Sequence, residues 1–121
     1  MSGEYHEPLE FLPQEAIEYH RIIKSVIEEL EAVDWYNQRA HATEDEQVRK
    51  IVAHNRDEEI EHACMGLEWL RRNSETWDEM LREFLFTETE ITSIEEEEEG
   101  GEEAESAENK SLGIGSLKEG K

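Results

Sequence analysis

Residues 48–69 read VRKIVAHNRDEEIEHACMGLEW, and the apolar side chains in this stretch recur every three or four positions. That spacing places them along one side of an α-helix. Glu59 and His62 interrupt the apolar stripe and lie three positions apart, so they share a helix face. The full stripe consists of Val48, Ile51, Val52, Asn55, Glu59, His62, Gly66 and Trp69. The sequence therefore predicts a helix whose inward face carries a carboxylate and an imidazole.

The ends of this helix carry their own signals. Residues 43–46 read TEDE, which matches the S/T-x-x-E capping box, so we expect the helix to begin there. Arg71 and Arg72 suit the negative end of the helix dipole, which places the other end near Asn73.

A longer helix is predicted before it, from Gln14 to about His41. Neither glycine nor proline occurs in this segment, and its apolar residues recur at helical spacing at Ile22, Ile23, Val26, Ile27, Leu30 and Val33. Roughly 28 residues would give a helix about 40 Å long. The short link between the two helices predicts an antiparallel hairpin. Glu29 falls on the inward stripe of the first helix, where the hairpin brings it opposite Glu59 and His62.

The remainder of the chain divides into three kinds of sequence. Ser74 can cap a third, shorter helix with one apolar face formed by Trp77, Met80, Leu81, Phe84 and Leu85. We interpret residues 1–94 as an all-α helical domain and residues 95–110 as an acidic, disordered linker. Apolar side chains occur again in residues 111–121 after this polar stretch, a pattern that is typical of short docking peptides.

Composition narrows the classes of function. The chain has 121 residues, with 33 acidic and 12 basic side chains and a formal net charge of -21, which disfavours binding to nucleic acid. No apolar run is long enough for a membrane span, and no secretion signal is recognised at the start. The single cysteine, Cys64, excludes an intrachain disulfide framework. The small core predicts stabilisation by partner subunits or metal.

The polar residues on the inward faces indicate a metal site. A glutamate from one helix and a Glu-x-x-His from another form half of a di-iron carboxylate site, so two hairpins related by a twofold axis would complete a four-helix bundle and the site. Two carboxylates and one imidazole suit iron or manganese. Spacing alone leaves open a glutamate-rich helix surface with an incidental histidine. We expect the face that carries Glu29, Glu59 and His62 to be buried.

Five segments of the sequence resemble the encapsulated ferritins. They are residues 28–36 (EELEAVDWY), 54–62 (HNRDEEIEH), 67–72 (LEWLRR), 84–88 (FLFTE) and 111–117 (SLGIGSL). The resemblance implies a ferroxidase that oxidises Fe(II) with dioxygen at a di-iron site between two subunits, within a ring of dimers that forms a decamer. It also implies that the protein is cargo inside an encapsulin nanocompartment in the cytoplasm, where it supplies iron for mineral storage.

The same resemblance assigns roles to individual residues. Glu29, Glu59 and His62 would be the catalytic metal ligands, and Tyr36 would lie next to them. Glu28 and Glu31 would form a site where metal ions enter, although a solvated acidic surface remains the alternative. The targeting peptide would use Leu112, Gly113, Ile114, Gly115, Ser116 and Leu117. The ligand set alone also permits a non-catalytic iron carrier or a scaffold assembled by metal.

Overall fold

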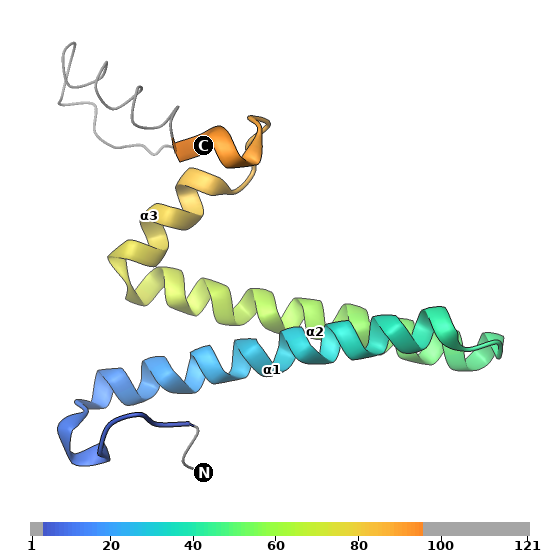
Figure 1. Cartoon of the computed structure of the whole chain (residues 1–121), viewed down its shortest axis with the longest axis horizontal. Helices are drawn as coiled ribbons and strands as arrows, with labels where there is room; N and C mark the ends of the chain where they lie inside the picture. The colour runs from blue at the N-terminus through green and yellow to red at the C-terminus, as the bar shows by residue number, and fades with distance from the viewer. Residues whose placement is uncertain (1–3, 96–121) are drawn as a thin grey trace. The chain divides into compact units, whose positions relative to one another are not determined.

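The computed structural model of the chain describes residues 4–95. Every regular element in that range is a helix, which confirms the predicted all-α class (Figure 1). The chain divides after Asp78 into two compact units, which we describe separately. The targeting peptide assigned to residues 111–121, and the linker assigned to residues 95–110 beyond its first residue, lie outside the described residues. Within the described range, no helix is both long and apolar enough to span a membrane.

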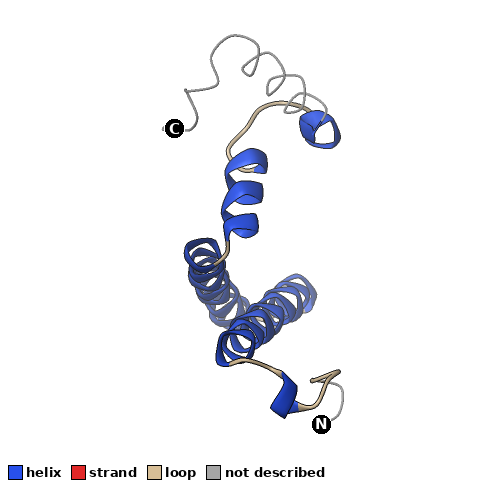
Figure 2. Ribbon diagram, turned by 90° about the vertical axis from the view of Figure 1, so that its left-hand side faces the viewer, coloured by secondary structure: helices blue, strands red, loops and turns tan. Residues whose placement is uncertain are grey.

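The first unit is built on a hairpin of two long helices. A short 3-10 helix, η1 (Leu9–Phe11), precedes α1 (Gln14–Ala42), which begins directly after Pro13. α1 packs along α2 (Glu46–Asn73), and two perpendicular views show the helices side by side (Figures 1 and 2). The predicted first and last residues of the helices lie within one residue of the observed ones, except for the first residue of α2. The hairpin brings the inward stripes of the two helices together.

The start of α2 differs from the predicted capping box. Asp45, not Thr43, is the N-cap residue, and its carboxylate accepts a hydrogen bond from the Val48 N–H at 3.1 Å. The Thr43 hydroxyl instead accepts from the Asp45 N–H at 3.1 Å. Thr43 is already the C-cap of α1, with its own N–H bonded to the carbonyl of Arg39. Thr43 therefore closes the turn and leaves Asp45 to cap the next helix.

Arg49 holds the two helices together at this end of the hairpin. Its guanidinium donates to the backbone carbonyls of Ala40 and Thr43 and pairs with Glu46. The carbonyls at the last turn of α1 have no partners within the helix, so this arginine satisfies groups that would otherwise need water. No pattern in the sequence predicts this contact.

The core of the hairpin is thin. Its buried apolar residues are Val26, Ala40, Ala63 and Leu70. Other large apolar side chains of α1 and α2 remain 41–58% exposed, namely Tyr19, Ile27, Leu30, Trp35, Val48, Ile51, Ile60 and Met65. Two helices enclose only the stripe that lies between them, so the apolar surface predicted from the sequence is wider than one hairpin can cover.

The third predicted helix is also present, as α3 (Glu75–Phe84). As expected, Ser74 caps it, because the serine hydroxyl accepts from the Trp77 N–H at 3.3 Å. Two contacts fix its first turn to the hairpin: the Trp77 indole N–H donates to the Tyr19 hydroxyl at 2.8 Å, and Arg71 donates to Asp78 at 2.6 Å. In the second unit the rest of α3 is followed by a short 3-10 helix, η2 (Ile91–Ser93).

Candidate metal centre

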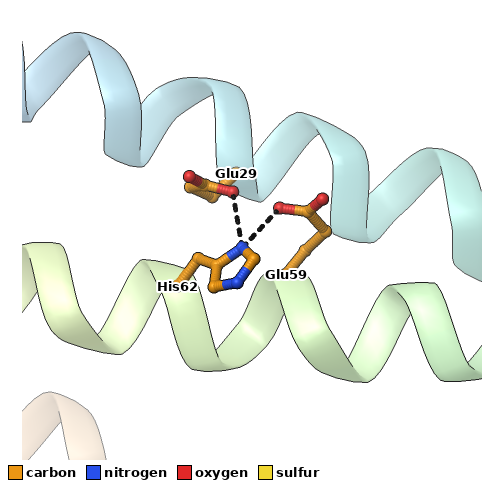
Figure 3. A group of neighbouring side chains, drawn as sticks. All are labelled: Glu29, Glu59 and His62. Atoms are coloured by element: carbon orange, nitrogen blue, oxygen red, sulfur yellow. Dashed lines mark hydrogen bonds and ion pairs between the residues drawn. The ribbon is translucent and has the colours of Figure 1, made fainter.

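Three side chains converge between the middle parts of α1 and α2. Glu29 comes from α1, while Glu59 and His62 come from neighbouring positions on α2, and Figure 3 shows all three directed toward one point. The His62 Nδ1 atom lies 3.4 Å from Glu59 Oε1 and 3.7 Å from Glu29 Oε1. One ligand atom from each residue lies within 4.8 Å of the others. Within residues 4–95, this is the one group of at least three such side chains placed to share an ion.

The three side chains of this group shift one another's pKa values. A hydrogen bond with Glu59, partial burial and the negative charge of Glu59 raise the pKa of Glu29. The same hydrogen bond lowers the pKa of Glu59, and His62 lowers it further. The hydrogen bond with Glu59 and the charges of both glutamates raise the pKa of His62. Two carboxylates this close favour one shared proton, and a cation could take that proton's place.

The group is only half-buried, contrary to the expectation of a buried face. The side chains of Glu29, Glu59 and His62 are 27%, 24% and 41% exposed. The reason is architectural, since two helices flank the group on one side only. Three protein ligands also leave positions free on any ion of ordinary coordination number. The site therefore has an open side.

The donor set fits a transition metal that favours oxygen and nitrogen ligands. Carboxylate oxygens with one imidazole nitrogen suit iron and manganese, whereas structural zinc favours closed sites rich in thiolate and imidazole. Cys64, the single sulfur atom able to form a thiolate, is exposed and is not part of the group. The chemistry of the residues present thus agrees with the predicted metal class.

The other predicted site residues lie outside the three-residue group. Glu28 and Glu31 are exposed on α1, on either side of Glu29 in the sequence. Tyr36 is half-buried two turns after Glu29, and its ring lies 5.3 Å from the Arg39 guanidinium carbon. These placements leave the roles of Glu28, Glu31 and Tyr36 as predictions.

Sequence reasoning missed a polar contact near the site. The Arg56 guanidinium donates to the Asn37 side-chain oxygen across the helices at 2.9 Å, one turn before Glu59. Both residues are half-buried. Arginine and asparagine within an acidic helix carry no periodic signal, so this contact becomes visible only once the two helices are in register.

Comparison with known proteins agrees with the helical architecture and the ligand group. The sequence model of the EncFtn-like family matches residues 4–88, which include both long helices and all three candidate ligands. The chain belongs to the EncFtn-like family. It is 56% identical over 125 residues to the "Encapsulated ferritin-like protein" of Rhodospirillum rubrum, an alignment that covers 97% of this chain and 89% of the relative.

Two further relatives extend the comparison. The EncFtn-like chain is 56% identical over 103 residues to the "Ferritin-like protein" of Thermotoga maritima, covering 85% of this chain and 90% of the relative. A crystal structure of a protein from Nitrosomonas europaea superposes with a TM-score of 0.70 at 52% identity, covering 72% of this chain and 96% of that one. This EncFtn-like chain is therefore a ferritin-like protein, and membership of such a family implies iron binding.

Proposed function

We propose that this protein is a ferroxidase, which oxidises Fe(II) to Fe(III) with dioxygen. The observation that supports this most is the convergence of Glu29, Glu59 and His62 from two helices onto one point. Iron is the substrate of this reaction and binds as Fe(II). Each iron that is oxidised gives up one electron to dioxygen, and the higher charge of Fe(III) is stabilised by an anionic ligand set.

The three side chains have distinct tasks. Glu29 and Glu59 supply negative charge that favours the oxidised ion, and either carboxylate can bind through one oxygen or two. His62 supplies the nitrogen ligand, and its Nδ1 atom faces both carboxylates, at 3.4 Å from Glu59 Oε1 and 3.7 Å from Glu29 Oε1. Metal binding requires both carboxylates to be ionised. The open side of the group leaves room for dioxygen and for a second metal.

A second copy of the chain would complete the site. The family arrangement needs two sets of ligands, and one chain holds a single set among its described residues. The exposed apolar residues of α1 and α2 give the hairpin a surface that a second hairpin could cover. We therefore propose a twofold dimer with a di-iron site between its subunits, and a ring of such dimers, a decamer, as the assembled form.

We further propose that the protein works inside an encapsulin nanocompartment in the cytoplasm, where it supplies iron for mineral storage. The support is the relative named "Encapsulated ferritin-like protein", whose alignment with 97% of this chain must extend well past residue 95. The residues proposed to dock to the shell are Leu112, Gly113, Ile114, Gly115, Ser116 and Leu117. Deleting residues 111–121 should leave iron oxidation intact and abolish co-purification with a co-expressed shell protein. Retained loading would contradict this role of the tail.

The oxidation proposal is tested by the initial rate of dioxygen-dependent Fe(II) oxidation, followed by absorbance. Glu59→Gln and His62→Ala should reduce the rate to that of the protein-free control, because each removes a metal ligand. Glu15→Gln makes the same chemical change as Glu59→Gln at an exposed position of α1 and should retain the full rate. Full activity in Glu59→Gln and His62→Ala would show that the site is assigned to the wrong residues.

The same assay separates the ferroxidase from its alternatives. If Fe(II) binds to the wild-type protein but oxidises no faster than in free solution, the protein is an iron carrier. If binding only enlarges the oligomer, it is a scaffold assembled by metal. If the protein neither binds iron nor changes its mass, then the ferroxidase, the iron carrier and the scaffold assembled by metal are all wrong.

A further inference from the structure

Gly66 lies in the interior of α2, where glycine is less favourable than any residue except proline. The structure gives a reason for its presence. A Cβ atom at this position would lie 2.5 Å from the Cγ2 atom of Val26 on α1. Carbon atoms in favourable contact are about 3.5–4.0 Å apart. The missing side chain therefore allows the two helices to approach each other at this point.

This close contact is the next layer along the hairpin from the candidate metal centre. Gly66 follows His62 by four residues on α2, and Val26 precedes Glu29 by three residues on α1, so each shares a helix face with a ligand. Val26 is buried, with 8% of its surface exposed. Its β-branched side chain has few alternative rotamers in a helix, so it cannot readily turn away from a larger neighbour. The Gly66–Val26 contact therefore determines how closely the two helices can approach each other beside the ligands.

The ligands depend on that separation because they come from different helices. The His62 Nδ1 atom on α2 lies 3.7 Å from Glu29 Oε1 on α1, and the three ligand atoms lie within 4.8 Å of one another. Bonds of roughly 2.1 Å to a small divalent ion require donor atoms no more than about 4.2 Å apart. At 3.7 Å the Glu29 Oε1 and His62 Nδ1 atoms lie inside this limit, so a wider separation of the helices would remove Glu29 from an ion held by Glu59 and His62.

We propose that Gly66 is a positioning residue of the metal centre. Its contact with Val26 holds α1 and α2 close enough for Glu29 to share one divalent ion with Glu59 and His62. This inference rests on the proposed function, since it assumes that these three residues bind Fe(II). It goes beyond that function by assigning the geometry of the site to a pair of residues that carry no ligand atoms.

The test is an anaerobic calorimetric titration of metal-free protein with Fe(II). Gly66→Ala should raise the Kd for iron about tenfold or more, the range found when groups that orient metal ligands are removed. Circular dichroism and oligomer mass, measured on the same samples, establish that the titrated protein is folded and assembled. Arg49→Ala is the matched control because it removes a different contact between the helices, and it should lower thermal stability while leaving the Kd unchanged.

A second substitution should restore binding. In the double variant Val26→Ala/Gly66→Ala the valine methyl that obstructs the new Cβ is absent. The next nearest atoms, Ile22 Cγ2 and Val26 Cβ, lie at the ordinary contact distances of 3.8 and 3.9 Å. The Kd of the double variant should therefore return to near the wild-type value. If Gly66→Ala does not fold, Val26→Leu enlarges the other side of the same contact and should weaken binding in its place.

The outcomes distinguish this inference from the function on which it rests. Wild-type affinity in folded Gly66→Ala would overturn the positioning role alone, and so would a double variant that stays as weak as Gly66→Ala. Failure of the wild-type protein to bind Fe(II) would overturn the proposed function, and this inference with it. If Gly66→Ala weakens binding and the second substitution restores it, the result would support the positioning role and the proposed function.

Discussion

Single side chains in this hairpin show how an acidic protein can keep carboxylates close together. Glu29 and Glu59 share a hydrogen bond across the helices, which raises the pKa of Glu29 and lowers the pKa of Glu59. Glu68 meets a different environment on α2. Its carboxylate accepts hydrogen bonds from Arg71 and from Arg72, at 2.8 and 2.7 Å. The pKa of Glu29 is thus raised beside another carboxylate, whereas two arginines lower the pKa of Glu68.

The contacts of Glu68 predict how stability depends on pH. Hydrogen bonds from Arg71 and Arg72 lower the pKa of Glu68 from 4.5 to about 2. Between these two values the folded protein binds fewer protons than the unfolded chain, so its stability falls as the pH falls. Glu68→Gln should therefore be less stable than wild type above pH 4.5, and the difference should vanish as the pH approaches about 2. Denaturant unfolding at several pH values measures this, and a pH-independent difference would contradict it.

Sequence spacing placed Glu29, Glu59 and His62 on facing sides of the two helices but left open whether they form a metal site. The three-residue separation of Glu59 and His62 fixes their shared face, and the position of Glu29 between Val26 and Val33 fixes its direction. The sequence could not reveal the direction in which the pKa of each glutamate is shifted or how open the group is. Both properties depend on distances across the hairpin, which are set by contacts such as that between Gly66 and Val26.

At the scale of the helices, local sequence determined almost all boundaries. Apolar periodicity defined α1 and α2, and Ser74 marked the start of α3. The capping box at residues 43–46 was misplaced because a three-residue link must end one helix and begin another. In such a short link the Thr43 hydroxyl is used by the turn itself. The motif alone does not show whether Thr43 or Asp45, two positions further along, will act as the cap.

The corrected cap predicts a difference between two substitutions in the link. Asp45→Ala should lower the free energy of unfolding by about 1 kcal/mol, because it leaves a helix N–H without its side-chain acceptor. Thr43→Val should cost less, since the Thr43 hydroxyl bonds to an N–H in the turn. Denaturant unfolding of both variants at equal protein concentration compares them. A larger loss in Thr43→Val would favour the capping box predicted from the sequence.

At the scale of the whole molecule, the chain exposes more apolar surface than a lone hairpin can stabilise. Few side chains are buried, while Leu30 and Ile51 remain 56% and 58% exposed on α1 and α2. The metal centre is open as well. Pairing with a second hairpin would cover apolar surface and supply a second set of ligands. The same dimer would therefore increase stability and complete the proposed site. The sequence indicated this need through its short core but could not show which surface meets the partner.

Assembly through this surface can be tested without touching the metal ligands. Ile51→Asp places a charge on the exposed apolar face of α2 and should reduce the oligomer toward single chains at micromolar concentration, since burial of an unpaired charge is unfavourable. Lys50→Asp introduces the same side chain at the neighbouring exposed position, which is already polar, and should assemble normally. Sedimentation velocity measures both. Unchanged mass in Ile51→Asp would place the interface elsewhere.

We propose that iron is held by Glu29, Glu59 and His62. The most direct measurement is anomalous diffraction at the iron absorption edge from crystals of the protein loaded anaerobically with Fe(II). We predict an iron peak within bonding distance of the three side chains, with a second peak held by the same residues of a second copy. Iron found only elsewhere, for example beside Glu28 and Glu31, would contradict the assignment.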